Sequence, residues 1–187
     1  MHVENTITIE RPIEEVFEYV AAPENDPTWV SASLRHRRTA PGPVHVGTTT
    51  EEDVKFLGRT ESYTWEVTHY EPPTDIAYRA TSGPLPGTAI RLRLEPVEGG
   101  TKFTHAVDLE PRGVYYKAMA PLIPWVAPRL LDSLDRTLKN LLEGEPTTPG
   151  PRPESASGTT MARIVAATVV AGIALLLLRR RNRSRRR

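Results

Sequence analysis

The chain has 187 residues, no cysteine and a net charge of +1 at pH 7, a length that accommodates one domain of ordinary size with appendages. The absence of cysteine excludes disulfides, cysteine-based zinc sites and a cysteine nucleophile. Residues 1–160 hold 16 Lys and Arg against 23 Asp and Glu, a balance of −7, whereas residues 161–187 hold 8 Arg and no acid. This acidic domain argues against nucleic-acid binding, which needs a basic surface.

The chain begins with a strand followed by a short helix. Residues 3–9 alternate between apolar and polar side chains, which predicts a strand. Pro12 suits the first turn of a helix, and two glutamates near the positive end support a helix over residues 13–20. Residues 25–27 begin a second short turn or helix that presents Trp29.

Most of the remaining chain has the two-residue period of antiparallel strands. Each segment has one apolar and one polar face, and proline or glycine separates the segments. Such a sheet covers a core on one side and meets water on the other. The predicted strands are residues 34–38, 47–57, 61–70, 76–81, 90–95 and 102–109.

A long helix is predicted to close the domain. Leucines recur at helical spacing over residues 128–143, whereas Pro121 and Pro124 indicate a broken lead-in over residues 114–125. That apolar lead-in suits a gate over a cavity, a surface that enters lipid, or simple packing on the sheet. Because one sheet face and one helix stripe need each other for burial, we predict an α+β fold of about seven curved antiparallel strands wrapped on the C-terminal helix.

The C-terminal end is predicted to be a membrane anchor. Residues 144–160 are rich in Pro, Gly, Ser and Thr and indicate a linker, and residues 161–178 contain the uncharged run that predicts one transmembrane helix. The arginine-rich tail, residues 179–187, fits anionic lipid headgroups, so we expect a lipid bilayer as a partner. The anchor residues are Ile164, Val169, Ile173, Leu178, Arg179, Arg180 and Arg181.

Two arguments bear on membrane orientation. The positive-inside rule would place the arginines in the cytoplasm and the domain outside. Yet the first twenty residues lack an apolar core for a cleavable signal peptide. We therefore favour a single-pass membrane protein whose domain, residues 1–143, is cytoplasmic.

The order of elements resembles the SRPBCC superfamily, also called START-like or helix-grip proteins. The resemblance rests on residues 11–17, 23–29, 46–48, 65–73 and 99–101, and it covers about residues 2–143. The similarity is greatest to the polyketide cyclase/dehydrase and lipid-transport branch. It implies a deep apolar cavity between sheet and C-terminal helix that binds lipids, polyketides or other hydrophobic small molecules. The superfamily has no universal catalytic motif, so the resemblance assigns no catalytic residue.

Inward-facing residues of the predicted strands and helix are candidates for lining that cavity, although each also suits an ordinary core. His105 and His69 share the inward phase and are candidate acid/base groups. Residues 51–53 place three acids on one strand, where we favour a solvated edge over a polar anchor in the cavity. The candidates are Tyr63, Trp65, Tyr78, Ile90, Leu92, Phe103, His105 and Leu134.

Three functions follow from these features. The first is a membrane-tethered, non-enzymatic binder or carrier of a hydrophobic small molecule. The second is a cyclase/dehydratase-type enzyme, with His105 or His69 as acid/base and Tyr63 or Tyr78 orienting an oxyanion. The third is a membrane scaffold. Because the chain lacks His-x-x-x-His, Glu-x-x-His and paired-carboxylate patterns, we expect neither a metal site nor a cofactor.

Overall fold

A computed structural model describes residues 1–56, 59–110, 121 and 123–144, and its centre is a seven-stranded antiparallel sheet. The strand order is β1-β7-β6-β5-β4-β3-β2, so only β1 is displaced from its sequence neighbours, pairing with β7. The predicted strands are confirmed within a few residues. Their bounds are β1 His2–Ile9, β2 Ser33–Arg38, β3 Thr49–Phe56, β4 Arg59–Glu71, β5 Asp75–Ser82, β6 Ala89–Val97 and β7 Gly100–Asp108.

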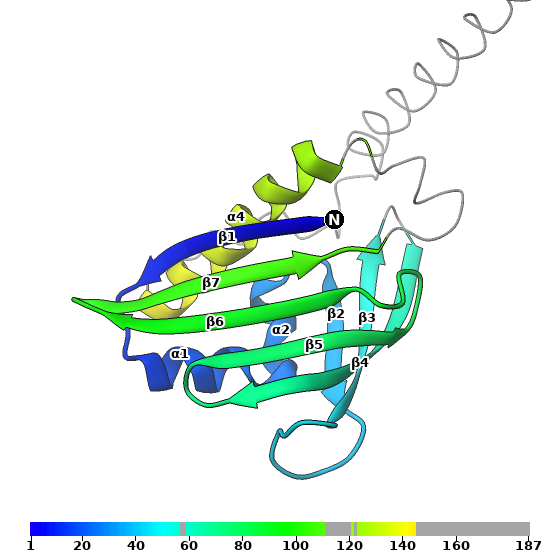
Figure 1. Ribbon diagram of the computed structural model, residues 1–187, viewed down its shortest axis with the longest axis horizontal. Helices are drawn as coiled ribbons and strands as arrows, with labels where there is room; N and C mark the ends of the chain where they lie inside the picture. Colours follow the sequence, from blue (N-terminus) through cyan, green and yellow to red (C-terminus); the bar gives the residue numbers. More distant parts are fainter. Residues whose placement is uncertain (57–58, 111–120, 122, 145–187) are drawn as a thin grey trace, which may run out of the picture. The chain divides into compact units, whose positions relative to one another are not determined.

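The sheet is strongly curled. In Figure 1, β2 and β3 run across the direction of β5, β6 and β7. The register between β4 and β5 shifts twice, between Thr64 and Trp65 and again between Val67 and His69, and β2 shifts against β3 beside Ser33. Such bulges bend a strand and increase its twist, which curls the sheet around the helices.

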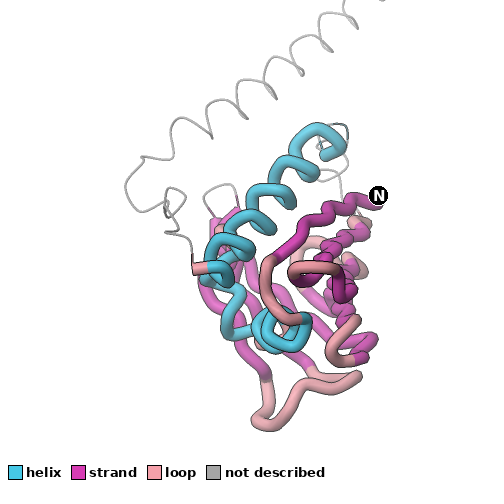
Figure 2. The backbone as a smooth tube through the Cα atoms, turned by 90° about the vertical axis from the view of Figure 1, so that its left-hand side faces the viewer, coloured by secondary structure: helices cyan, strands magenta, loops and turns pink. Residues whose placement is uncertain are grey.

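All described helices lie on one face of the sheet (Figures 1 and 2). They are α1 (Ile13–Val20), a 3₁₀ turn (Pro23–Asn25), α2 (Asp26–Trp29) and α4 (Ile123–Glu143). The prediction for α1 is confirmed, with its apolar stripe buried against the sheet. The core joins sheet and helices, and its most buried large side chains include Ile9, Val16, Val20, Val67, Ile76, Leu94, Phe103 and Leu138.

The C-terminal helix begins earlier than the sequence predicts. It starts at Ile123 rather than near Pro128, because Pro124 falls in the first turn, where a missing backbone N–H costs nothing. Pro128 lies inside the helix and removes one backbone hydrogen bond. The freed carbonyl group is that of Pro124, an exposed residue, so water can satisfy it.

Polar contacts hold the other end of α4 to the start of the chain. The Glu143 carboxylate accepts a 2.6 Å hydrogen bond from the backbone N–H of Glu10. Arg11 donates to the carbonyl of Leu142 at 2.7 Å, and Lys139 donates to the carbonyl of Thr8 at 2.8 Å. The Leu142 carbonyl is one of those that the last helical turn leaves without a partner, and together the three bonds fix α4 along β1.

Apart from Gly144, the predicted linker and the membrane anchor fall outside the described ranges, which end at that residue. Most of the predicted lead-in, residues 114–125, lies outside them as well. Within the described ranges no helix combines the length and hydrophobicity needed to cross a bilayer.

Candidate functional site

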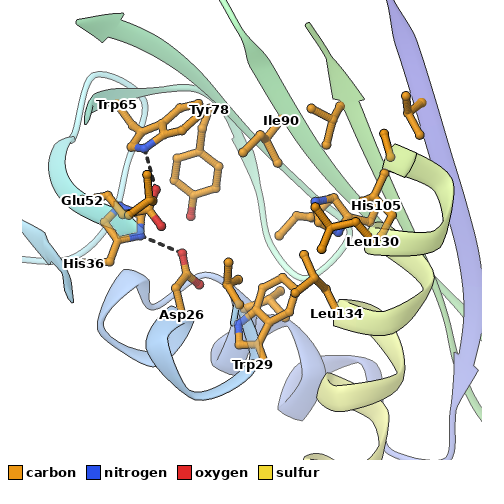
Figure 3. Close-up of a pocket in the computed structure, with 18 of the residues that line it drawn as sticks. Asp26, Trp29, His36, Glu52, Trp65, Tyr78, Ile90, His105, Leu130 and Leu134 are labelled. Carbon is orange, nitrogen blue, oxygen red and sulfur yellow. Dashed lines mark hydrogen bonds and ion pairs between the residues drawn. The ribbon is translucent and has the colours of Figure 1, made fainter. Parts of the chain in front are cut away.

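A cavity of about 270 Å³ lies between the sheet, α2 and α4 (Figure 3). This volume is close to the lower end of the range of small-molecule sites, roughly 300–1,000 Å³. Apolar side chains form most of the wall. The lining residues are Val3, Val20, Asp26, Trp29, Val30, His36, Glu52, Val54, Trp65, Tyr78, Ile90, Leu92, His105, Val107, Leu109, Ala127, Leu130, Leu131 and Leu134.

Most of the candidate cavity residues named from the sequence line this space, and two do not. Trp65, Tyr78, Ile90, Leu92, His105 and Leu134 are in the wall. Tyr63 instead stacks on the Trp65 ring at a centroid distance of 5.4 Å, and Phe103 is fully buried in the core behind His105. The roles of these residues toward a ligand remain predictions.

The inward phase that the sequence predicts for His69 is wrong. The register shift between Val67 and His69 leaves Thr68 as an extra residue on β4. One extra residue reverses the alternation, so Tyr70 turns toward the core and contacts the Phe17 ring. The imidazole of His69 is 44% exposed and pairs with Glu71, outside the cavity.

His105 is held by a buried carboxylate. Its Nδ1 lies 2.9 Å from Oδ1 of Asp135, whose other oxygen accepts a 2.7 Å hydrogen bond from the amide of Asn5. Asp135 is completely buried. No described residue hydrogen-bonds Nε2 of His105, and the imidazole lines the cavity. A carboxylate on Nδ1 favours the tautomer whose free Nε2 accepts a proton, which is the arrangement of a general base.

A second polar cluster forms another part of the wall (Figure 3). Asp26 Oδ2 lies 2.6 Å from Nδ1 of His36, and Nε2 of His36 lies 2.7 Å from the Thr50 hydroxyl. The Trp65 indole donates a 2.9 Å hydrogen bond to Glu52. One ligand atom from each of Asp26, His36 and Glu52 lies within 4.8 Å of the others.

Glu52 is the inward-facing acid of the three at residues 51–53. The prediction that these acids lie on a solvated edge is wrong for Glu52, which is buried beside Trp65. Glu51, on the outer face, is exposed and pairs with Arg37. Burial raises the pKa of the Glu52 carboxyl, the nearby His36 lowers it, and the net direction is upward. The inner carboxyl therefore binds a proton more tightly than an exposed glutamate does.

Two further hydrogen-bond donors belong to the cavity wall. The indole N–H of Trp29 is buried and has no partner among the described residues. No described residue hydrogen-bonds the hydroxyl of Tyr78, and burial, followed by the charge of Asp26, raises the pKa of that phenol well above its ordinary value. Both groups therefore stay neutral donors, available to an oxygen atom in the cavity.

Sequence reasoning missed several of these polar residues. Asp26, His36 and Glu52 come from α2, β2 and β3, so no local spacing indicates that they meet. Asp135 did leave a signal, because it lies between Leu131 and Leu138 on the apolar stripe of the helix. An acid on a buried helix face needs a partner, which is His105 here.

A curled antiparallel sheet that holds a C-terminal helix over an apolar cavity defines the helix-grip class of proteins. The chain belongs to the polyketide cyclase / dehydrase and lipid transport family, whose sequence profile matches residues 1–143. The resemblance to the SRPBCC superfamily is thereby confirmed, and the family suggests hydrophobic ligand binding or cyclase activity. No curated protein matches the chain.

Solved structures agree on the fold. TTHA0849 from Thermus thermophilus is 13% identical with a TM-score of 0.66, and the match covers 79% of this chain and 100% of that one. A START superfamily protein from Mycobacterium smegmatis is 18% identical with a TM-score of 0.63, over 76% and 97% of the two chains. The Zhui aromatase/cyclase from Streptomyces sp. R1128 is also 18% identical, with a TM-score of 0.62 over 76% and 93%.

Proposed function

We propose that the protein binds a hydrophobic small molecule, lipid-like or polyketide-like, in the cavity between sheet and α4. The observation that carries this proposal is a cavity wall made mostly of apolar side chains and containing a few polar groups, which is the usual composition of a small-molecule site. Burying an apolar ligand there is favourable by roughly 25 cal/mol per Å² of apolar surface. The family match supports the same ligand class.

The polar groups narrow the ligand chemistry. The unpartnered N–H of Trp29 and the hydroxyl of Tyr78 are donors, so the ligand carries at least one oxygen that accepts hydrogen bonds. A purely hydrocarbon ligand would leave the Trp29 donor unsatisfied, which costs about 1–3 kcal/mol. An oxygenated ligand such as a fatty acyl group or a polyketide satisfies it.

We further propose that this cavity lies beside a bilayer. The uncharged run at residues 164–178, bounded by Arg163 and Arg179, is the basis for a single-pass anchor, and the linker would let the domain reach the surface. The exposed Trp125 and Val126 start the same helix whose Leu130 and Leu134 line the cavity. An apolar surface next to the cavity suits ligand exchange with lipid.

Ligand binding is tested by mass spectrometry of the full-length protein purified under mild conditions, followed by titration with a lipid panel. Leu134→Trp fills the cavity and is expected to abolish both the co-purified ligand and binding, whereas Leu34→Trp, at an exposed position on β2, leaves both intact. A full-length protein that carries no extractable molecule and binds none of the panel contradicts the proposal.

A second function, a cyclase/dehydratase-type enzyme, is supported by one specific observation. His105 is held by Asp135 and presents an Nε2 without a described partner to the cavity, as a general base requires. His105→Asn should then abolish turnover of a polyketide substrate while ligand binding persists. If the His105→Asn variant converts the polyketide substrate as fast as the unaltered protein, His105 is not the base. If the unaltered protein converts no polyketide, the enzyme hypothesis fails.

The side of the membrane is tested with one engineered cysteine. Because the chain has none, Val46→Cys, at an exposed loop position, would provide a unique thiol. A cytoplasmic domain predicts labelling by a membrane-impermeant maleimide only after the cells are permeabilised. Labelling of intact cells would instead place the domain outside.

A further inference from the structure

The cluster of Asp26, His36 and Glu52 has the composition of a metal site. It combines one imidazole with two carboxylates, and one donor atom from each residue lies within 4.8 Å of the others. The residues come from α2, β2 and β3, so three separate elements hold them in place. The side chains of Asp26 and His36 are only 18% and 6% exposed, and Glu52 is also buried.

The negative charge of the two carboxylates in this cluster must be neutralised. Two carboxyl groups share one imidazole, and the described contacts of the cluster include no lysine or arginine. Burying carboxylates without a compensating charge is costly, so protons or a cation must neutralise them. A divalent ion would neutralise both carboxylates at once.

Surrounding groups orient His36 and Glu52 as outer contacts orient metal ligands. Thr50 bonds Nε2 of His36 at 2.7 Å, which fixes the ring and leaves Nδ1 directed at Asp26. The indole of Trp65 holds one oxygen of Glu52. Metal-bound histidines and carboxylates typically have such second partners. The ion would displace the proton now shared between Asp26 and His36.

Trp29 supplies an independent sign that something binds at this end of the cavity. Its indole N–H is buried, unpartnered among the described residues, and in Figure 3 the nitrogen lies on the side of the ring that faces Asp26. Trp29 and Asp26 are three residues apart on α2, so they share a face. An oxygen bound to the ion from the cavity side would accept that N–H.

We propose that Asp26, His36 and Glu52 bind one divalent transition-metal ion, with its remaining coordination positions open to the cavity. Imidazole suits zinc, iron and nickel better than magnesium or calcium, so Zn²⁺ is the appropriate probe. Three protein ligands with an open fourth position are typical of catalytic rather than structural zinc. An open position would let an oxygen of the cavity ligand coordinate the ion.

The test is a competition titration of Zn²⁺ against a chromogenic chelator, using tag-free, full-length protein stripped with EDTA. Unaltered protein should bind a single equivalent of Zn²⁺ and bind Mg²⁺ far more weakly. Glu52→Gln and His36→Gln should each weaken Zn²⁺ binding at least about 10-fold. Trp65→Phe, which removes the indole hydrogen bond to Glu52 but no metal ligand, should weaken it about 10-fold.

Two control variants separate this site from adventitious binding. Glu51→Gln changes the exposed neighbour on the same strand, and His2→Gln removes an exposed imidazole that lies near Glu4 and Asp108. Both should leave Zn²⁺ affinity unchanged, with circular dichroism confirming that every variant is folded. Absence of saturable Zn²⁺ binding overturns the proposal, as does a loss with His2→Gln while folded Glu52→Gln binds normally. The outcome is independent of any organic ligand.

Discussion

Replacing Asp135 tests how much its buried carboxylate contributes to the stability of the domain. The residue is fully buried on α4 and accepts hydrogen bonds from Asn5 at 2.7 Å and from His105 at 2.9 Å. Asp135→Ala removes both acceptors, and no other described acceptor bonds the two donors. The donor of the buried His105, left unsatisfied, costs about 1–3 kcal/mol, whereas the half-buried Asn5 amide can bond water and adds less, so the expected loss in unfolding free energy is about 2–4 kcal/mol.

Asp132, one turn earlier on the same helix, provides the matched control. It forms an exposed i,i+4 pair with Arg136, and such a solvent-screened pair contributes little to stability. Urea unfolding of the full-length protein measures both variants, and an unchanged m-value shows that the unfolded state is unaltered. If Asp135→Ala is no less stable than Asp132→Ala, the buried bonds of Asp135 contribute nothing and the reasoning fails.

Asp135→Asn separates stability from the state of the imidazole. The asparagine carbonyl still accepts from Asn5, while its NH₂ group faces His105 and favours the tautomer with its proton on Nε2. The cost in stability should therefore be about 1 kcal/mol, well below that of Asp135→Ala. Nitrogen-15 chemical shifts of His105 report the tautomer directly, and an unchanged tautomer in Asp135→Asn would contradict a carboxylate-controlled imidazole.

Three further predictions concern the core, the acidic cluster and the exposed start of α4. Phe103→Ala should cost about 3–5 kcal/mol in urea unfolding, because the ring is completely buried, and a loss below about 1 kcal/mol would contradict its place in the core. The raised pKa of Glu52 means that, above its ordinary value of 4.5, the folded protein holds a proton that the unfolded chain has released, so stability falls as pH rises through the folded pKa. Glu52→Gln should flatten this pH dependence, Glu51→Gln should not, and equal slopes for all three proteins would refute the assignment. Trp125→Ser should weaken binding to anionic vesicles, whereas Leu34→Ser, at another exposed apolar position, should not; equal losses would exclude a specific contact.

The spacing of apolar residues along the sequence was sufficient to predict most of the fold. Apolar alternation located every strand within a few residues, and Pro12 with its following glutamates located α1. This spacing could not predict the one-residue bulge in β4. No residue type near Thr68 indicates the bulge. The extra residue nevertheless turns His69 away from the cavity side of the sheet and Tyr70 toward the core.

The site was harder to predict because its polar residues come from three elements and meet only when those elements pack together. The pairing of β2 with β3 brings His36 opposite Glu52, and α2 then adds Asp26. No pattern in sequence expresses that three-way contact. Trp65, Tyr78 and Leu134 were predictable because an apolar residue on an inward phase has few other places to lie.

The arrangement of the cavity wall constrains how the proposed ligand lies. Figure 3 shows His105 on one side and the cluster of Asp26, His36 and Glu52 on the other, with Tyr78 beside that cluster. The other lining residues are mostly apolar, so an oxygen placed against them would lose its hydrogen bonds to water without replacement. The ligand's oxygens must therefore lie at the two polar places while its apolar part contacts the leucines of α4. An ordered ligand with two oxygens is consequently the occupant that this wall would select over a singly oxygenated one.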